Sequence, residues 1–254
     1  MNVLIVNDDG IESEGLRVLA ERVGKNHDVY VLAPDSNRSA ASHHILMFHD
    51  LELIPHKKNW WGCSGMPADC TCVALRSGLF DVDFDVVISG INDGANMGTD
   101  IVYSGTCAGA RQAVLSGIPG IAVSLFPDGP HGWNGEGAKY VALADFVSDN
   151  LEALAEMSAE KYPGTFVNIN AVSRDSYKGV RIANRLQVRH YNEDIRIERT
   201  SNGVFSHFNP RDDGPPACDS GTDFDYAQSG YIVLSMVHAQ PLAANVVDGI
   251  SFKV

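Results

Sequence analysis

The chain has 254 residues, of which 44% are hydrophobic and 20% are charged, and this composition supports one folded domain with an appendage. Its formal net charge of -13 disfavours a nucleic-acid polymer or an anionic membrane as a partner, because like charges repel. No apolar run is long enough to cross a bilayer and no basic signal segment precedes the first strand, so we expect a cytoplasmic protein.

The first forty residues predict two buried strands separated by a helix. Residues 3–6 and 29–33 are short apolar runs, which are typical of strands in a parallel sheet. Between them, apolar residues recur at helical spacing from Leu16 to Val23, and Gly24 follows as a helix end. Each strand runs into a polar loop. In open α/β sheets, ligands bind at these carboxyl ends of the strands.

Asp8 and Asp9 stand directly after the first strand. Two adjacent carboxylates repel each other, and a divalent cation offsets that repulsion most readily. The alternative is an Asx turn that begins the first helix. Ser39 and Asn92 follow the second and third strands at the same edge of the sheet, so we expect carboxylate, hydroxyl and amide oxygens to converge. This donor set suits Mg²⁺ or Mn²⁺ rather than zinc.

Residues 41–61 combine alternating apolar and polar positions with two adjacent tryptophans, and they predict an inserted hairpin. The adjacent His43 and His44 are interpreted as loop residues rather than catalytic ones. A helix follows, with Pro67 in its first turn and Gly78 after its last.

Residues 86–88 predict a third buried strand, and a loop rich in glycine and asparagine follows it. Glycines let backbone amides approach a ligand, and Asn96 adds a side-chain amide to the loop. Ser104, Gly105 and Thr106 then begin a helix, whose free N–H groups form an anion site. The alternative is that Ser104 or Thr106 only caps the helix. The density of these residues favours a ligand-binding loop.

Strands and helices continue to alternate in the middle of the chain. Residues 120–125 and 166–170 predict two further strands, and residues 137–157 predict one long amphipathic helix between them. This alternation predicts an α/β fold with a doubly wound, mostly parallel sheet.

Beyond the fifth strand the pattern changes to extended, partly polar segments at 180–188 and 191–208, followed by a turn at Gly221-Thr222-Asp223 and a strand at 231–237. An arm too thin to bury its own apolar faces usually packs on a second subunit. We therefore expect a core at residues 1–175 and, at residues 176–254, an arm and a returning strand that are used in oligomerisation.

The five cysteines are odd in number and irregularly spaced, so we expect reduced thiols. Cys70 and Cys72 lie two apart in a predicted helix and therefore face different directions, which indicates core positions rather than a zinc site. Asp212 and Asp213 lie beside glycine and proline and are assigned to a solvent-exposed loop.

Six motifs, in order and at family-like intervals, make the chain similar to the survival protein E (SurE) family of metal-dependent nucleotidases. They cover the first half of the chain densely and the arm more loosely. The motifs are N-D-D-G at 7–10, A-P-D-S-N-R-S at 33–39, G-M-P-A-D-C at 65–70, S-G-I-N-D-G-A-N-M-G at 89–98, Y-S-G-T at 103–106 and G-I-P-G-I-A-V-S at 117–124.

The resemblance implies a Rossmann-like core, a homodimer or tetramer formed through the C-terminal arm, and hydrolysis of nucleoside 5'-monophosphates. It also implies occasional use of 3'-monophosphates and short polyphosphate, and one divalent cation per subunit. The metal ligands that it implies are Asp8, Asp9, Ser39 and Asn92. The phosphate-binding residues that it implies are Asn96, Ser104, Gly105 and Thr106.

A hypothesis for the mechanism follows from these roles: water activated by the cation attacks phosphorus, and Asp8 or Asp9 orients or deprotonates that water. The chain departs from the family where Ala40 and Ala41 replace a glycine-containing segment after the arginine, which stiffens the loop beside the cation.

Three alternatives belong to other classes of protein. A non-catalytic nucleotide-binding regulator would keep the phosphate loop without needing a metal. A haloacid-dehalogenase-type phosphatase requires D-x-D after the first strand, which the chain lacks. A metal-dependent deacetylase of Rossmann type would need histidine ligands, which the motifs do not provide.

Overall fold

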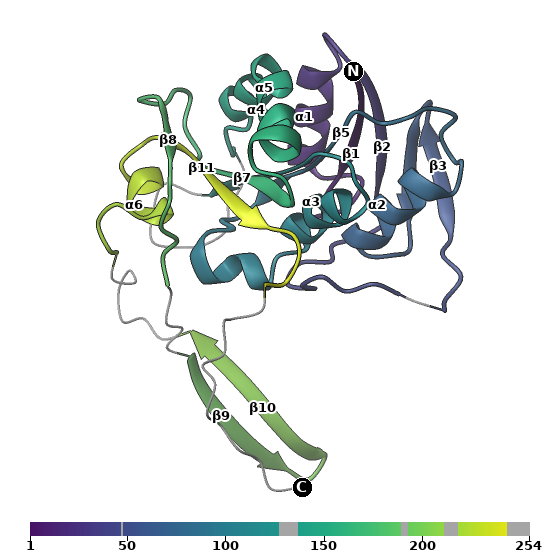
Figure 1. Cartoon of the computed structure of the whole chain (residues 1–254). Helices are drawn as coiled ribbons and strands as arrows, with labels where there is room; N and C mark the ends of the chain where they lie inside the picture. Colours follow the sequence, from purple (N-terminus) through teal and green to yellow (C-terminus); the bar gives the residue numbers. More distant parts are fainter. Residues whose placement is uncertain (47, 127–136, 189–192, 211–217, 243–254) are drawn as a thin grey trace, which may run out of the picture.

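The computed structural model describes residues 1–46, 48–126, 137–188, 193–210 and 218–242, which form a nine-stranded sheet, helices on both of its faces and a separate two-stranded hairpin (Figure 1). The strands of the sheet are β1 (Asn2–Val6), β2 (Asp28–Pro34), β3 (Leu53–Lys57), β4 (Trp60–Cys63), β5 (Val86–Asp93), β6 (Gly120–Phe126), β7 (Thr165–Val172), β8 (Val180–Ile182) and β11 (Ile232–His238). The hairpin strands are β9 (Glu193–Thr200) and β10 (Gly203–Pro210).

The α-helices are α1 (Glu14–Val23), α2 (Pro67–Arg76), α3 (Gly105–Leu115), α4 (Val141–Asp149), α5 (Leu151–Glu156) and α6 (Asp223–Gln228). A 3₁₀ helix, η1 (Gly98–Val102), precedes α3, and a π-helix, η2 (Met157–Lys161), follows α5. In the described ranges, no helix combines the length and the apolar character needed to cross a membrane.

The strand order is β3-β4-β2-β1-β5-β6-β7-β11-β8, and the six strands from β4 to β7 in this order run parallel. Only β3 and β11 are antiparallel to an inner neighbour, β4 and β7 respectively. The prediction of a doubly wound, mostly parallel sheet is therefore confirmed. Strand β1 lies between β2 and β5. The chain adds β2 on one side of β1 and later adds β5 on the other side, so the strand order changes direction at β1. This reversal makes the carboxyl ends of β1, β2 and β5 a topological switch point, which is where ligands bind in such sheets.

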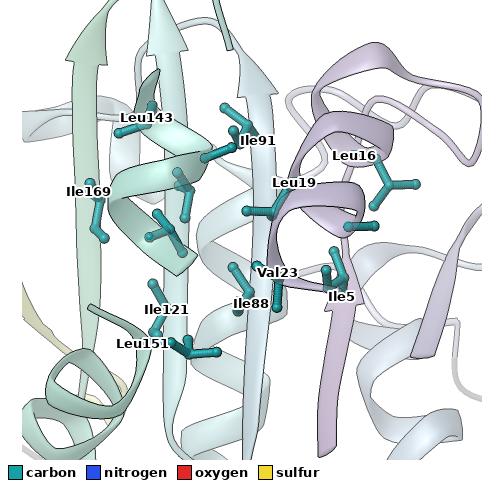
Figure 2. Close-up of a cluster of buried hydrophobic side chains, with 14 of the residues drawn as sticks. Ile5, Leu16, Leu19, Val23, Ile88, Ile91, Ile121, Leu143, Leu151 and Ile169 are labelled. Carbon is teal, nitrogen blue, oxygen red and sulfur yellow. The ribbon is translucent and has the colours of Figure 1, made fainter. Parts of the chain in front are cut away.

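Successive side chains of the inner strands point to opposite faces of the sheet, so each strand supplies two cores. Ile5 and Ile88 pack under α1 and α4 in the cluster of Figure 2. Their neighbours Leu4 and Val87 pack on the other side, with Cys70 of α2. Because both faces are covered, the strands are apolar along nearly their whole length, and this is why they were recognisable in the sequence.

The predicted single helix at residues 137–157 is wrong. The described part of this segment becomes helical only at Val141, and α4 and α5 are separated at Asn150, which has φ -117° and ψ 13°. The side-chain amide of Asn150 donates a hydrogen bond to the carbonyl of Phe146 at 2.8 Å. Asparagine side chains compete for backbone groups in this way, so a continuous apolar periodicity does not guarantee a continuous helix.

The C-terminal part of the chain contributes to two separate sheets. Strands β8 and β11 join the edge of the main sheet, whereas β9 and β10 form the hairpin that stands away from it in Figure 1. The extended segment predicted at 180–188 is a strand only in its first three residues. Asp212 and Asp213 lie outside the described residues.

Candidate active site

The loops after β1, β2 and β5 are tied directly to one another. The backbone N–H of Arg38 donates to the carbonyl oxygen of Asp8 at 2.7 Å. The backbone N–H of Asp93 donates to Oδ2 of Asp9 at 2.9 Å. Ser39 and Asn92 are the immediate chain neighbours of these two donors. The structure thus brings together the three strand ends that carry Asp8, Asp9, Ser39 and Asn92.

The start of α3 also contacts Asp8. The hydroxyl of Thr106 donates to Oδ1 of Asp8 at 2.5 Å, and the backbone N–H of Thr106 donates to Oδ2 at 3.1 Å. A Cβ atom at Gly105 would lie 2.9 Å from both Cβ and Oδ2 of Asp8, which explains a glycine at this helix start. The positive end of the α3 dipole therefore points at the Asp8 carboxylate.

Ser39 and Asn92, the chain neighbours of Arg38 and Asp93, each supply one side-chain oxygen. The hydroxyl oxygen of Ser39 is buried and has no hydrogen-bond partner in the structure. The amide nitrogen of Asn92 donates to the carbonyl of Gly94 at 2.9 Å, which leaves the amide oxygen as the side-chain acceptor. A buried polar atom without a partner is unfavourable unless a ligand completes its coordination. These donors therefore fit a hard cation.

Burial makes the two carboxylates expensive to ionise. Desolvation raises the pKa of Asp8, against the opposing effect of the hydrogen bonds from Thr106. Desolvation and then the charge of Asp8 raise the pKa of Asp9 to about 7. No ion pair of the described residues includes either carboxylate, whereas a bound divalent cation would stabilise both ionised forms. In the described ranges, no group of three or more His, Cys, Asp or Glu side chains is placed to hold a metal ion.

The raised pKa of Asp9 predicts how the stability of the metal-free protein changes with pH. Between about pH 4 and pH 7, folded Asp9 keeps a proton that the unfolded chain has already lost, so stability falls as the pH rises. The expected decrease in the free energy of unfolding is on the order of 3 kcal/mol. Urea unfolding in a chelator at several pH values measures it, and Asp9→Asn should flatten this part of the profile. Identical pH profiles for the variant and the wild type would contradict the prediction.

Ser104 and Asn96 lie on two different elements: Ser104 precedes α3, and Asn96 follows β5. Ser104 caps α3, since its hydroxyl oxygen accepts the backbone N–H of Cys107 at 2.9 Å. That hydroxyl retains its own proton as a donor. Asn96 is 6% exposed and lies in the loop after β5. Ser104 is therefore the N-cap of α3, and its hydroxyl proton stays available to a ligand.

The loop after Asn96 is anchored to the base of the C-terminal excursion. Gly98 has φ +55°, and a Cβ atom there would lie 1.8 Å from the carbonyl oxygen of Gln187. The carboxylate of Asp223, which is 1% exposed, accepts the backbone N–H groups of Gly98 and Gln187, each at 2.7 Å. One buried side chain thus joins the candidate site to both ends of the segment that carries the hairpin.

The segment after Ser39, where the chain has alanines in place of the family's glycines, adopts backbone angles that favour glycine. Ala40 has φ +59° and Ser42 has φ +53°, so the loop next to Ser39 is strained as well as less flexible. His43 is half-buried, and its Nε2 lies 3.0 Å from Oε1 of Gln112 in the middle of α3, away from the helix start. The guanidinium of Arg38 pairs with Asp35 at 3.0 Å.

Sequence reasoning missed the residues that support the site from within the sheet. Ser124 on β6 and Asn168 and Asn170 on β7 contact Asn96 by hydrogen bonds, and all three are fully buried. Two asparagines spaced two apart in an apolar strand were a visible signal, because a buried amide requires a partner. Asp223 was taken as part of a turn, although it begins α6.

A cavity of about 430 Å³ lies between α1 and α4. Its lining includes Glu14, Lys139 and Tyr140, but none of the carboxylate, hydroxyl and amide donors described above. Lys139 at its edge forms an ion pair with Asp175. The cavity is therefore distinct from the candidate site at the ends of β1, β2 and β5.

Comparison with known proteins gives concordant matches. The family model described as Survival protein SurE matches residues 3–193. A protein of Treponema pallidum (strain Nichols) named 5'-nucleotidase SurE is 44% identical over 180 residues, which are 70% of this chain and 93% of that protein. A protein of the same name from Legionella pneumophila (strain Paris) is 32% identical over 245 residues, 94% of this chain and 91% of the relative. The crystal structure of the SurE protein from Aquifex aeolicus has a TM-score of 0.79 at 28% identity and 94% coverage of both chains.

Proposed function

The chain belongs to the survival protein SurE family, and from this premise we propose that it is a 5'-nucleotidase that hydrolyses nucleoside 5'-monophosphates with the help of a divalent cation. Relatives that bear the name 5'-nucleotidase and align with up to 94% of the chain support the class of reaction. The observation that carries the proposal in this chain is the pair of carboxylates of buried Asp8 and partly buried Asp9, of which Asp8 accepts hydrogen bonds from the start of α3 and Asp9 accepts one from the end of β5.

Asp8, Asp9, Ser39 and Asn92 would hold one Mg²⁺ or Mn²⁺ ion per subunit. Four oxygen donors from three strand ends match the preference of such ions, and the uncompensated carboxylates provide the negative charge. When bound, the cation supplies Lewis-acid polarisation of a phosphoryl oxygen and lowers the pKa of a bound water.

The residues of the chain bind and orient the phosphoryl group. The hydroxyl of Ser104, whose oxygen accepts the N–H of Cys107, donates its proton to a phosphoryl oxygen. The loop that contains Asn96 binds the phosphoryl group from the other side. Gly105, which lacks a Cβ, lets the Asp8 carboxylate lie against the helix start beside the proposed position of the phosphoryl group. Thr106, whose donors are both used by Asp8, acts by holding that carboxylate in place.

The attacking water is oriented by a carboxylate. Both oxygens of Asp8 accept hydrogen bonds from Thr106, whereas the hydrogen bond from Asp93 uses only Oδ2 of Asp9. Oδ1 of Asp9 is therefore the better placed acceptor for a proton of the water. In-line attack of this water at phosphorus releases the nucleoside and inorganic phosphate.

The proposed function includes assembly through the C-terminal arm. Directly opposite residues of an antiparallel hairpin share a face, and the pairing of Ile197 with Ser206 and of Arg199 with Val204 places Ile197 and Val204 on one face. Ile195 shares that face; the exposed fractions of Ile195, Ile197 and Val204 are 55%, 49% and 65%. An exposed apolar face on a two-stranded hairpin supports docking on a second copy of the chain in a homodimer or tetramer.

Removal of the cation is expected to abolish phosphate release. Phosphate is measured with nucleoside 5'-monophosphates, 3'-monophosphates and short polyphosphate as substrates, first in chelator and then after addition of Mg²⁺ or Mn²⁺. We expect no turnover in chelator, recovery with either ion, and the highest kcat/KM for the 5'-monophosphates. Undiminished turnover in chelator would overturn the metal-dependent reaction. Nucleotide binding without turnover under every condition would instead indicate a non-catalytic regulator.

A further inference from the structure

The buried strand β7 contains two asparagines that the proposed chemistry does not use. Asn168 and Asn170 are both 0% exposed and lie two positions apart, so their side chains share one face of the sheet. A buried amide without partners costs free energy, and apolar residues occupy most of the remaining strand. The two amides therefore need a reason to be present.

Their partner is the backbone of Asn96. The side-chain nitrogens of Asn168 and Asn170 both donate to the Asn96 carbonyl oxygen, at 2.8 Å and 3.0 Å. The Asn96 N–H donates to Oδ1 of Asn170 at 2.8 Å. The Asn96 side chain is fixed as well, because its Nδ2 donates to the hydroxyl oxygen of Ser124 on β6 at 2.8 Å. Three neighbouring side chains thus hold both the main chain and the side chain of one loop residue.

The same cluster also contacts helix α3. The thiol of Cys107 donates to Oδ1 of Asn168, with 3.7 Å between sulfur and oxygen. Cys107 follows Thr106 in the first turn of α3. Asn168 therefore contacts both the Asn96 loop and the helix start, and it sets their separation.

We propose that Ser124, Asn168 and Asn170 are positioning residues that hold Asn96 at the separation from α3 that a phosphoryl group requires. They act through Asn96 and do not touch the substrate. This inference rests on the proposed function, because it assigns the Asn96 loop to the phosphoryl group. It predicts that removing a hydrogen bond between these three residues and Asn96 lowers the affinity for phosphate, beyond any decrease in melting temperature that a matched buried substitution causes.

Two serines of the same sheet provide a matched test. Ser124 is 0% exposed and accepts the hydrogen bond from Asn96, whereas Ser235 on β11 is 2% exposed and its hydroxyl has no partner. Ser235 lies directly opposite Asn168 in the pairing of β7 and β11. Replacing either serine by alanine removes one buried hydroxyl from the sheet. Only Ser124→Ala removes a hydrogen bond to the Asn96 side chain.

The affinity for inorganic phosphate is measured by calorimetry in the presence of Mn²⁺, together with KM and kcat for a nucleoside 5'-monophosphate and the melting temperature. Loss of one hydrogen bond should weaken phosphate binding by about fivefold in Ser124→Ala. Loss of two in Asn170→Leu should weaken it by about twentyfold or more. KM should rise in parallel, the Mn²⁺ concentration for half-saturation should stay constant, and Ser235→Ala should match the wild type throughout.

Equal phosphate affinities in Ser124→Ala and Ser235→Ala would overturn the proposal, even if both melt at lower temperature, because a purely structural role changes stability alone. The Ser124 variant keeps the test decisive if Asn170→Leu does not fold. Failure of the proposed function would look different: the wild type would bind phosphate without releasing it from any nucleotide, and the comparison of phosphate affinities would still decide the positioning role.

Discussion

Replacement of Asp8 by asparagine is expected to lower kcat for nucleoside monophosphate hydrolysis by roughly a thousandfold. The change removes one of the two negative charges that face the cation. It also turns an amide toward the two hydrogen-bond donors of Thr106, which both point at the carboxylate in the wild type. Steady-state phosphate release at saturating Mn²⁺ measures the loss, and excess Mn²⁺ should not restore the rate.

The stability of the same variant separates a catalytic loss from a folding defect. Burial raises the pKa of Asp8, so the ionised carboxylate destabilises the metal-free fold, and a neutral amide avoids this cost. We expect metal-free Asp8→Asn to melt no lower than the wild type at pH 8. The control is Asp145→Asn, which removes a half-exposed ion pair with Arg22 and should change neither rate nor stability much. A fully active Asp8 variant would exclude this carboxylate from the reaction.

The double substitution of Ile197 and Val204 by aspartate is expected to convert the assembled protein into monomers. The two residues share one face of the hairpin, and their exposed fractions in the single chain are 49% and 65%. If that face is buried against a second copy, each unpaired carboxylate costs about 2 kcal/mol or more, which together weaken association by about a thousandfold. Sedimentation velocity over a range of protein concentrations measures the change.

Arg196→Asp provides the control, because Arg196 pairs with His207 on the opposite face of the hairpin. This variant should sediment as the wild type does. The proposed role of the arm would be wrong if the wild type were monomeric, or if the double variant stayed assembled at the same concentrations. Circular dichroism of the monomeric variant should still show the spectrum of the main sheet, since the hairpin forms a separate sheet.

The strands of the core could be predicted because each of them is a local signal. Residues 3–6, 29–33 and 120–125 are apolar runs between polar loops, and the observed β1, β2 and β6 include them all. The end of α1 followed from Gly24, and the structure identifies Ser13 as its N-cap, since the hydroxyl oxygen of Ser13 accepts the N–H of Leu16. Caps and periodicity act within a few residues, so a sequence displays them directly.

The apolar periodicity of residues 137–157 predicted one helix, whereas the polar side chain of Asn150 lies at the break between two helices. The apolar spacing continues through Asn150, yet the side chain of Asn150 bonds the backbone of Phe146 and separates α4 from α5. Helix α6 was missed for a related reason. It has only six residues, and Gly221 and Thr222 before it are typical of a turn. Thr222 is in fact its cap, because its hydroxyl oxygen accepts the backbone N–H of Asp225.

Local spacing was enough to predict the alternation of strands and helices and to place Asp8, Asp9, Ser39 and Asn92 near strand ends, because a few neighbouring residues encode both. The tertiary structure alone decided that Thr106 holds Asp8 across 98 residues and that Asp223 holds Gly98 across 125 residues. Such contacts depend on how distant elements pack, and packing is a property of the whole fold that no local pattern contains.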